Sequence, residues 1–182
     1  QFDRALTFLH EAMTLAQETH VTHRNGALHF RIGEVQMFLG QYKDALASYE
    51  QAVVWAQNDQ NDLLLRAVWS NIAVTYFYQG QFDLALNYYR DVERQLGDDL
   101  EALPVAMKAI AQHNQNALGL TLVEMGRYAE AKGYFYRGLK LARELNSPEM
   151  MAYLYLNLGA ANYWLKDYAE AQDCFVHGQN LA

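Results

Sequence analysis

The chain contains 182 residues, of which 52% are hydrophobic and 19% are charged, a composition that excludes a disordered segment and suits a folded core. The 14 basic and 21 acidic residues give a net charge of -7 without any lysine or arginine cluster, which disfavours direct binding to nucleic acid or an anionic membrane and favours a cationic or neutral partner. The single cysteine, Cys174, cannot form an internal disulfide, and neither a signal segment nor a membrane-spanning apolar run is visible, so we expect a cytoplasmic protein.

A short sequence block recurs along the whole chain. Its aromatic residue falls at Phe2, Tyr42, Phe82, Tyr128 and Tyr168, in steps of 40, 40, 46 and 40 residues. An alanine follows each aromatic three positions later, and in three blocks a glycine precedes the aromatic by two positions. Self-similarity at a period of a few tens of residues indicates a repeat architecture. We therefore expect one continuous array rather than domains joined by linkers.

Each block lies between two stretches of helical periodicity. Ala45, Tyr49 and Ala52, for example, recur at spacings of four and three and share one helix face. Asn61 and Ser147 stand where N-caps are expected, and a proline follows the second of them. In chain order, the pattern predicts helices at 2–19, 22–39, 42–57, 62–79, 82–96, 104–125, 128–145, 148–165 and 168–182.

The helix before each turn carries a large residue beside a very small one. These pairs are Ile32 with Gly33, Ile72 with Ala73, Leu118 with Gly119, and Leu158 with Gly159. The small residue should let a neighbouring helix approach closely. In the helix after each turn, one aromatic residue is expected in the core: Tyr49, Tyr89, Phe135 and Phe175.

The single step of 46 residues places extra residues around 97–104. This segment contains glycine, proline and the acidic pair Asp98 and Asp99, so it is expected to form a loop that shifts the third repeat from regular stacking. The simpler interpretation is a tolerated surface loop with solvated charges, and a functional insertion is the alternative.

The pattern resembles the tetratricopeptide repeat. In that family, helix A carries the large and small pair, a glycine stands at the turn, and helix B opens with an aromatic residue and an alanine. The resemblance covers nearly the whole chain, but the period is 40 residues instead of about 34, helix B lacks its closing proline, and Lys166 replaces the last turn glycine. It implies an all-α, right-handed α–α superhelix of the long-period variety found in bacterial signalling regions, transcription-activator sensor regions and kinesin light chains.

The resemblance divides the chain into a leading half repeat and four repeats, at 1–20, 21–60, 61–103, 104–146 and 147–182. The array begins and ends inside a repeat, and neither end shows the polar cap that a solenoid needs. We therefore expect a fragment of a larger protein, with exposed terminal helices that can pair two copies into a homodimer.

The resemblance also implies a concave groove, lined by the helix A faces, that receives an extended peptide or a partner helix. In the first two complete repeats, the implied groove residues are Phe30, Arg31, Glu34, Met37, Phe38, Ser70, Asn71, Val74, Phe77 and Tyr78. In the last two repeats, they are His113, Asn116, Ala117, Leu120, Glu124, Tyr153, Leu156, Asn157, Ala160, Tyr163 and Trp164.

Three groove asparagines, Asn71, Asn116 and Asn157, occupy equal or adjacent repeat positions and are expected along one wall. An asparagine offers a donor and an acceptor to the backbone of an extended peptide. Each such hydrogen bond contributes about 0.5–1.5 kcal/mol, so the aromatic residues must add apolar burial. The alternative is that these side chains cap helices or face water. The lysine and arginine clamp with which some family members hold chaperone tails is absent, so a chaperone partner is not expected.

The sequence shows no catalytic constellation, phosphate-binding loop or complete set of metal ligands, so we expect no catalytic, cofactor or metal site. His20, His23 and His29 lie close together, but no cysteine or carboxylate completes a metal site. Cys174 has no histidine beside it in the helical register, as expected of a buried, inert thiol.

The leading hypothesis is a non-enzymatic protein- or peptide-binding scaffold that serves as the sensor or interaction region of a larger bacterial signalling or regulatory protein. Two alternatives stay open: a small-ligand-responsive sensor region of a transcription activator, and a self-assembly module. Fold alone does not separate these roles.

Overall fold

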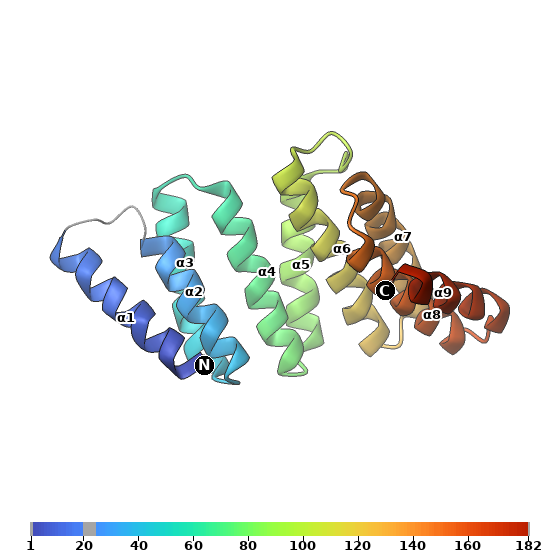
Figure 1. The fold of residues 1–182 in the computed structure, drawn as a ribbon, viewed down its shortest axis with the longest axis horizontal. Coiled ribbons are helices and arrows are strands. Elements are labelled where there is room, and N and C mark those ends of the chain that lie inside the picture. The colour runs from blue at the N-terminus through green and yellow to red at the C-terminus, as the bar shows by residue number, and fades with distance from the viewer. Residues whose placement is uncertain (1, 20–24, 182) are drawn as a thin grey trace. The chain divides into compact units, whose positions relative to one another are not determined.

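A computed structural model describes residues 2–19 and 25–181 of the chain (Figure 1). Within these residues the regular structure is entirely α-helical, which confirms the predicted fold class. Contacts divide the chain into two compact units, Gln1–Gln81 and Phe82–Ala182. None of the described helices combines the length and the apolar character that crossing a bilayer requires.

The first unit contains α1 (Phe2–Glu18), α2 (Asn25–Phe38), α3 (Tyr42–Asn58) and α4 (Asp62–Tyr78). Helices that follow one another along the chain pack side by side in antiparallel order, and α2 also contacts α4 (Figure 1). The start predicted for the second helix, at 22–24, lies outside the described residues.

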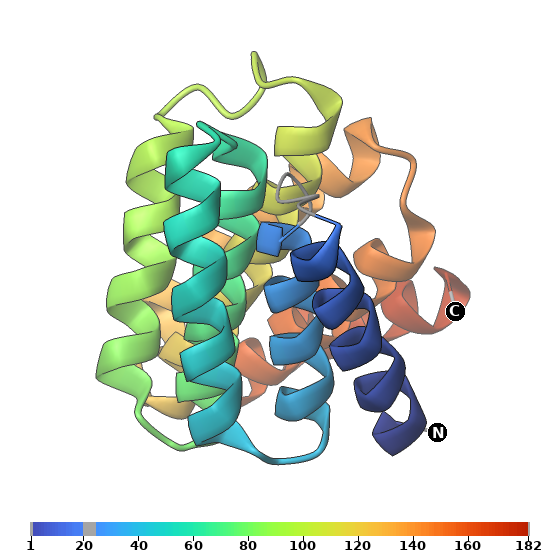
Figure 2. The same ribbon diagram turned by 90° about the vertical axis from the view of Figure 1, so that its left-hand side faces the viewer.

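The second unit contains α5 (Phe82–Leu96), α6 (Val105–Glu124), α7 (Tyr128–Glu144), α8 (Pro148–Trp164) and α9 (Tyr168–Leu181). Successive helices again pack against one another, and α6 also contacts α8. The connection between α5 and α6 rises above the ends of both helices, in yellow-green at the top of Figure 2. Every predicted helix is present in the described residues, and the ends that can be compared lie within a few residues of the expected positions.

Glycine allows helix A and helix B of a repeat to pack very closely. A Cβ atom at Gly33 would lie 2.5 Å from the Tyr49 ring, and one at Gly119 would lie 2.3 Å from the Phe135 ring. Atoms cannot approach that closely, so these two contacts require a residue without a side chain. Tyr49 and Phe135 are fully buried, which confirms the role predicted for the small residue.

The last helix departs from this pattern. Phe175 lies against Gly159 in the same way, and a Cβ atom there would be 2.7 Å from its ring. Yet Phe175 is 36% exposed, whereas Tyr89 is 2% exposed. Among the described helices only α8 packs extensively against α9, so the outer side of the ring faces solvent. The expectation that Phe175 is as buried as its counterparts is wrong.

The ends of the helices follow the predicted signals in part. The Asn61 side chain accepts a hydrogen bond from the backbone N–H of Leu64 at 3.0 Å, which confirms the N-cap of α4. Ser147 is the N-cap residue of α8, as predicted, but its side chain makes no capping hydrogen bond. Pro148 begins α8 with a backbone angle that already suits a helix, and the start does not depend on a cap.

Lys166 keeps the turn conformation that glycine adopts elsewhere. Its φ is +66°, close to the +73° of Gly126 at the equivalent turn. A side chain in this left-handed region costs about 1–2 kcal/mol, but the surrounding helices hold the turn in place. The missing glycine therefore leaves the last helical hairpin intact.

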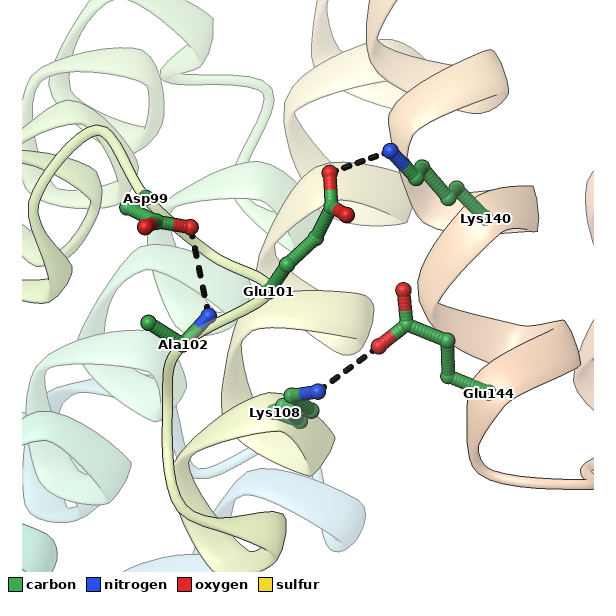
Figure 3. Close-up of polar contacts among 6 residues, drawn as sticks. All are labelled: Asp99, Glu101, Ala102, Lys108, Lys140 and Glu144. Atoms are coloured by element: carbon green, nitrogen blue, oxygen red, sulfur yellow. Dashed lines mark hydrogen bonds and ion pairs between the residues drawn. The ribbon is translucent and has the colours of Figure 1, made fainter.

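Ion pairs fasten the loop at 97–104 and the start of α6 to α7 (Figure 3). Glu101 pairs with Lys140, and Lys108 pairs with Glu144 across 2.7 Å. In Figure 3, Lys140 on α7 points toward the loop, and Glu144 on α7 points toward Lys108 of α6. The inserted residues therefore form an attached surface loop.

Asp98 and Asp99 in this loop are exposed, as expected, but Asp99 also has a hydrogen-bond partner. The Asp99 carboxylate accepts a hydrogen bond from the backbone N–H of Ala102 at 3.2 Å, which closes a local turn (Figure 3). One of the two carboxylates thus has a structural use. The prediction of a functional insertion stays untested.

Candidate functional site

Two asparagines mark the face that α6 and α8 share in the second unit, which we call the α6–α8 face. The Asn157 amide donates a hydrogen bond to Asn116 Oδ1 at 2.9 Å, and both side chains are half-buried. The pairing uses one donor and one acceptor. The Asn116 N–H groups and Asn157 Oδ1 keep hydrogen-bonding capacity that no described residue takes up. The pair therefore presents both a donor and an acceptor to a ligand.

Four aromatic rings gather where α8 ends, and we call them the aromatic end cluster: Tyr128, Tyr163, Trp164 and Tyr168. The Tyr128 and Trp164 rings stack with centroids 5.9 Å apart and planes 10° from parallel. Tyr163 meets Tyr168 edge to face at 5.6 Å and Trp164 likewise at 6.0 Å. Trp164 is 59% exposed, so a large apolar surface faces solvent. Such a surface suits stacking against a ligand.

The remaining predicted residues of this face differ in exposure. Tyr153 is 62% exposed, and Glu124, the last residue of α6, is also exposed. Leu120 is half-buried. His113 as a whole residue is exposed, but partial burial of its ring lowers the pKa of the side chain. The side chain is therefore neutral at pH 7.

The predicted residues on α2 largely satisfy one another. Arg31 pairs with Glu34 at 2.6 Å, and its guanidinium lies 5.5 Å from the centre of the Phe30 ring. Met37 is only 8% exposed and offers little surface to a ligand. Phe38 is 65% exposed and stacks on a ring of α1, where the centroids are 5.7 Å apart.

The predicted residues on α4 include the third asparagine. The Asn71 amide donates to the backbone oxygen of Ala67 in its own helix at 3.1 Å. Val74 and Phe77 are half-buried, and Tyr78 is 62% exposed. The structure thus pairs two of the three expected carboxamides, whereas Asn71 belongs to the other unit and donates locally.

Sequence reasoning missed the buried polar residues of α6. Asn114 donates to the backbone oxygen of Tyr89 at 3.0 Å, and Gln115 donates to Glu93 at 3.2 Å. Glu93 also lies 3.5 Å from Arg137 on α7. These contacts join α5, α6 and α7 and hold the α6–α8 face in position. A run of amides inside an otherwise apolar helix was the available signal.

Tyr128 and Tyr168 were also missed as members of the aromatic end cluster: Tyr168 is 59% exposed, and Tyr128 is half-buried. Both are the first residue of a helix B, where the repeat pattern indicated only structural aromatics. Their recurrence at the turn of every block was the signal that could have placed them beside the predicted groove residues.

The surroundings of the cysteine do not activate its thiol. Cys174 is 6% exposed, burial raises the pKa of its thiol, and the Asn162 amide lies 3.8 Å from its sulfur. His20 and His23 lie outside the described residues. Among the residues that are described, no group of histidine, cysteine and carboxylate side chains could hold a metal ion. The α6–α8 face offers hydrogen bonds and ring stacking.

Antiparallel helix pairs of fixed period, closed by a glycine against an aromatic ring, define a helical-hairpin repeat protein. Two models of the tetratricopeptide repeat match the sequence, at residues 24–96 and 115–149. The chain belongs to the tetratricopeptide repeat family. The search of curated proteins found no match to this sequence.

Several solved structures share the fold. BtubC from P. vanneervenii is 23% identical, with a TM-score of 0.79 over 100% of this chain and 72% of that one. A putative kinesin light chain from P. anserina is 16% identical, with a TM-score of 0.75 over 100% and 86%. The apo quorum sensor NprR from B. thuringiensis is 18% identical, with a TM-score of 0.85 over 100% of this chain and 49% of NprR. The chain thus spans about half of NprR.

Proposed function

We propose that the chain is a peptide-binding scaffold and that the α6–α8 face receives an extended segment of its partner. The observation that carries this proposal is the hydrogen-bonded pair Asn116 and Asn157, which has spare donors and an acceptor beside an exposed aromatic surface. A peptide backbone needs both kinds of group from its receptor whatever its side chains are. The pair provides them without a charge.

Apolar contact must supply most of the affinity. Hydrogen bonds to the asparagine pair contribute about 0.5–1.5 kcal/mol each. Tyr153 and Trp164 stand on either side of Asn157 along α8 and are 62% and 59% exposed. Covering rings of this size releases about 25 cal/mol for each Å² of apolar surface. A peptide that follows α8 can use the pair for alignment and the rings for affinity.

The wider role that we propose is the sensor or interaction region of a larger signalling or regulatory protein in the cytoplasm. The fold shared with the quorum sensor NprR supports it, as does the fold shared with a signal transduction ATPase of Pyrococcus horikoshii that contains a tetratricopeptide repeat sensor. We propose no catalytic activity. A small-ligand-responsive region of a transcription activator stays a prediction from the sequence.

Selection from a phage-displayed library of random linear peptides tests the binding proposal. We expect peptides whose affinity falls several-fold in Asn116→Ala and in Asn157→Ala, because each substitution removes a backbone partner. Gln172→Ala is the matched control, since this exposed amide lies on α9 and not on α6 or α8. Circular dichroism checks that the variants stay folded. An empty selection, or peptides indifferent to both asparagines, contradicts the proposal.

Self-assembly is a second candidate because both end helices expose large apolar side chains. On α1, Phe8 and Leu15 are 60% and 59% exposed, and on α9, Val176 is 48% exposed. Association through these helices predicts that the average mass measured by light scattering rises with protein concentration and that Val176→Lys suppresses the rise. A constant monomer mass at every concentration rejects this candidate.

A further inference from the structure

The charges on α6 and α8 are unbalanced. The one basic residue of α6, Lys108, pairs with Glu144 at 2.7 Å, and α8 contains no lysine or arginine. Glu124 and Glu149 are exposed, and neither has an ion-pair partner among the described residues. His113 is neutral at pH 7 because its pKa is lowered. The two helices therefore carry unpaired negative charge and no available positive charge.

One of these carboxylates lies at the same end of the helices as the aromatic end cluster. Glu124 is the last residue of α6, and Trp164 is the last residue of α8. Tyr128 follows Glu124 after the turn at 125–127 and stacks on Trp164 at 5.9 Å. The carboxyl ends of helices add partial negative charge. The carboxylate, the stacked rings and the helix ends thus all favour a positively charged ligand.

We propose that this end of the α6–α8 face binds a lysine or arginine side chain of the peptide, so that the partner is a basic segment. Aromatic ring faces attract cations, and the Glu124 carboxylate at the same end of the helices adds charge attraction. Arginine fits better than lysine because its flat guanidinium stacks on rings such as that of Trp164. The inference rests on the proposed peptide-binding function and names the chemistry of the partner.

The neighbouring cations leave room for such a side chain. Arg127 in the turn is held by two hydrogen bonds to Glu130, at 2.8 and 2.7 Å, so its charge is already balanced. Lys166 is exposed in the turn after α8, two residues beyond Trp164 in the sequence. Its charge should weaken binding of a basic peptide, so Lys166→Gln is expected to strengthen it.

Two capped peptides test the inference on the intact chain: acetyl-Gly-Ser-Arg-Ser-Gly-amide and the same peptide with Gln in place of Arg. Binding is followed by NMR through the indole N–H resonance of Trp164, which is assigned with Trp164→Phe. We expect the Arg peptide to shift this resonance at lower concentration than the Gln peptide. Glu124→Gln should weaken the Arg peptide by up to about fivefold, as expected for an exposed ion pair, and leave the Gln peptide unchanged.

Glu149→Gln is the matched control, because it removes the same charge at the opposite end of α8. It should change the affinity for the Arg peptide less than Glu124→Gln does, and added salt should weaken the Arg peptide more than the Gln peptide. If Glu124→Gln and Glu149→Gln weakened binding of the Arg peptide equally, the attraction would come from the net charge of the protein, and the inference would be overturned.

Failure of the inference can be distinguished from failure of the proposed function. Displayed peptides that depend on Asn116 and Asn157 but contain no basic residue leave the function standing and reject the basic partner. A selection that yields no ligand for the α6–α8 face rejects both. A Trp164 resonance that moves with protein concentration alone shows a contact between copies and also overturns the inference.

Discussion

At Gly119, a single added carbon should disturb the packing of a whole helix pair. Its missing Cβ atom would lie 2.3 Å from Cε1 of the Phe135 ring, which is fully buried. We predict that Gly119→Ala lowers the free energy of unfolding by about 1–3 kcal/mol through overpacking, measured by urea denaturation.

Gly133 provides the control on the same helical hairpin. It lies inside α7, and a Cβ atom there meets nothing within 4 Å. Alanine loses less backbone entropy than glycine in a helix, so Gly133→Ala should raise the stability by roughly 0.5–1 kcal/mol. If both substitutions changed the stability in the same direction, close packing at Gly119 would not explain the effect.

Residue-level predictions from the sequence succeeded where the repeat fixes the environment. The small residue opposite a buried ring follows from register alone, as Gly33 with Tyr49 shows. The bond between Asn116 and Asn157 could not be predicted, because it joins residues 41 positions apart that do not occupy the same repeat position. Its formation depends on how two helices rotate against each other, which is decided by the packing of the whole hairpin.

The helices α7 and α9 are linked by a polar contact whose strength depends on pH. Glu170 accepts hydrogen bonds from the Tyr136 hydroxyl and from Lys132 at 3.0 Å, and these donors lower the pKa of its carboxyl group below the ordinary value. A lowered pKa in the folded state gives stability that is present above the unfolded pKa and is lost as pH falls through the folded pKa. We predict that the wild type loses more stability on acidification below about pH 4.5 than Glu170→Gln does.

At alkaline pH, the same contact makes the protein less stable as the pH rises. The hydrogen bond to Glu170, followed by burial, raises the pKa of Tyr136 to about 12. This contribution to stability is present below the ordinary tyrosine pKa and is lost as pH rises toward the raised value. Urea denaturation across the pH range checks both limbs. Identical pH profiles for the wild type and Glu170→Gln would show that the contact does not stabilise the fold.

At the scale of elements, helix positions were the most predictable feature. The fifth predicted helix, 82–96, matches α5 at both ends, and the eighth differs only at its last residue. Hydrophobic period and turn residues determine such limits locally. The side chain of Ser147 shows where local signals stop: its position is that of a cap, yet it makes no capping bond beside Pro148.

In the whole molecule, the stability of a repeat should depend on whether neighbours cover both of its sides. Phe135 and Phe175 occupy equivalent positions, and each lies against a glycine of its own repeat. Phe135 lies on α7, which packs against both α6 and α8, and is 0% exposed. Phe175 lies on α9, for which α8 is the only extensive contact among the described helices, and is 36% exposed. Sequence register alone makes the two residues alike, and the contacts of their helices with the other described helices separate them.

Substitution of these two residues measures that dependence. We predict that Phe135→Ala lowers the free energy of unfolding by about 3–5 kcal/mol, whereas Phe175→Ala costs less than this range because part of its ring already faces water. Hydrogen exchange should likewise show lower protection for the backbone amides of α9 than for those of α7. In a repeat array, the stability of each repeat depends on its contacts with the neighbouring repeats. Equal costs at the two positions would mean that α9 is covered in solution, which is the outcome that self-association through this helix predicts.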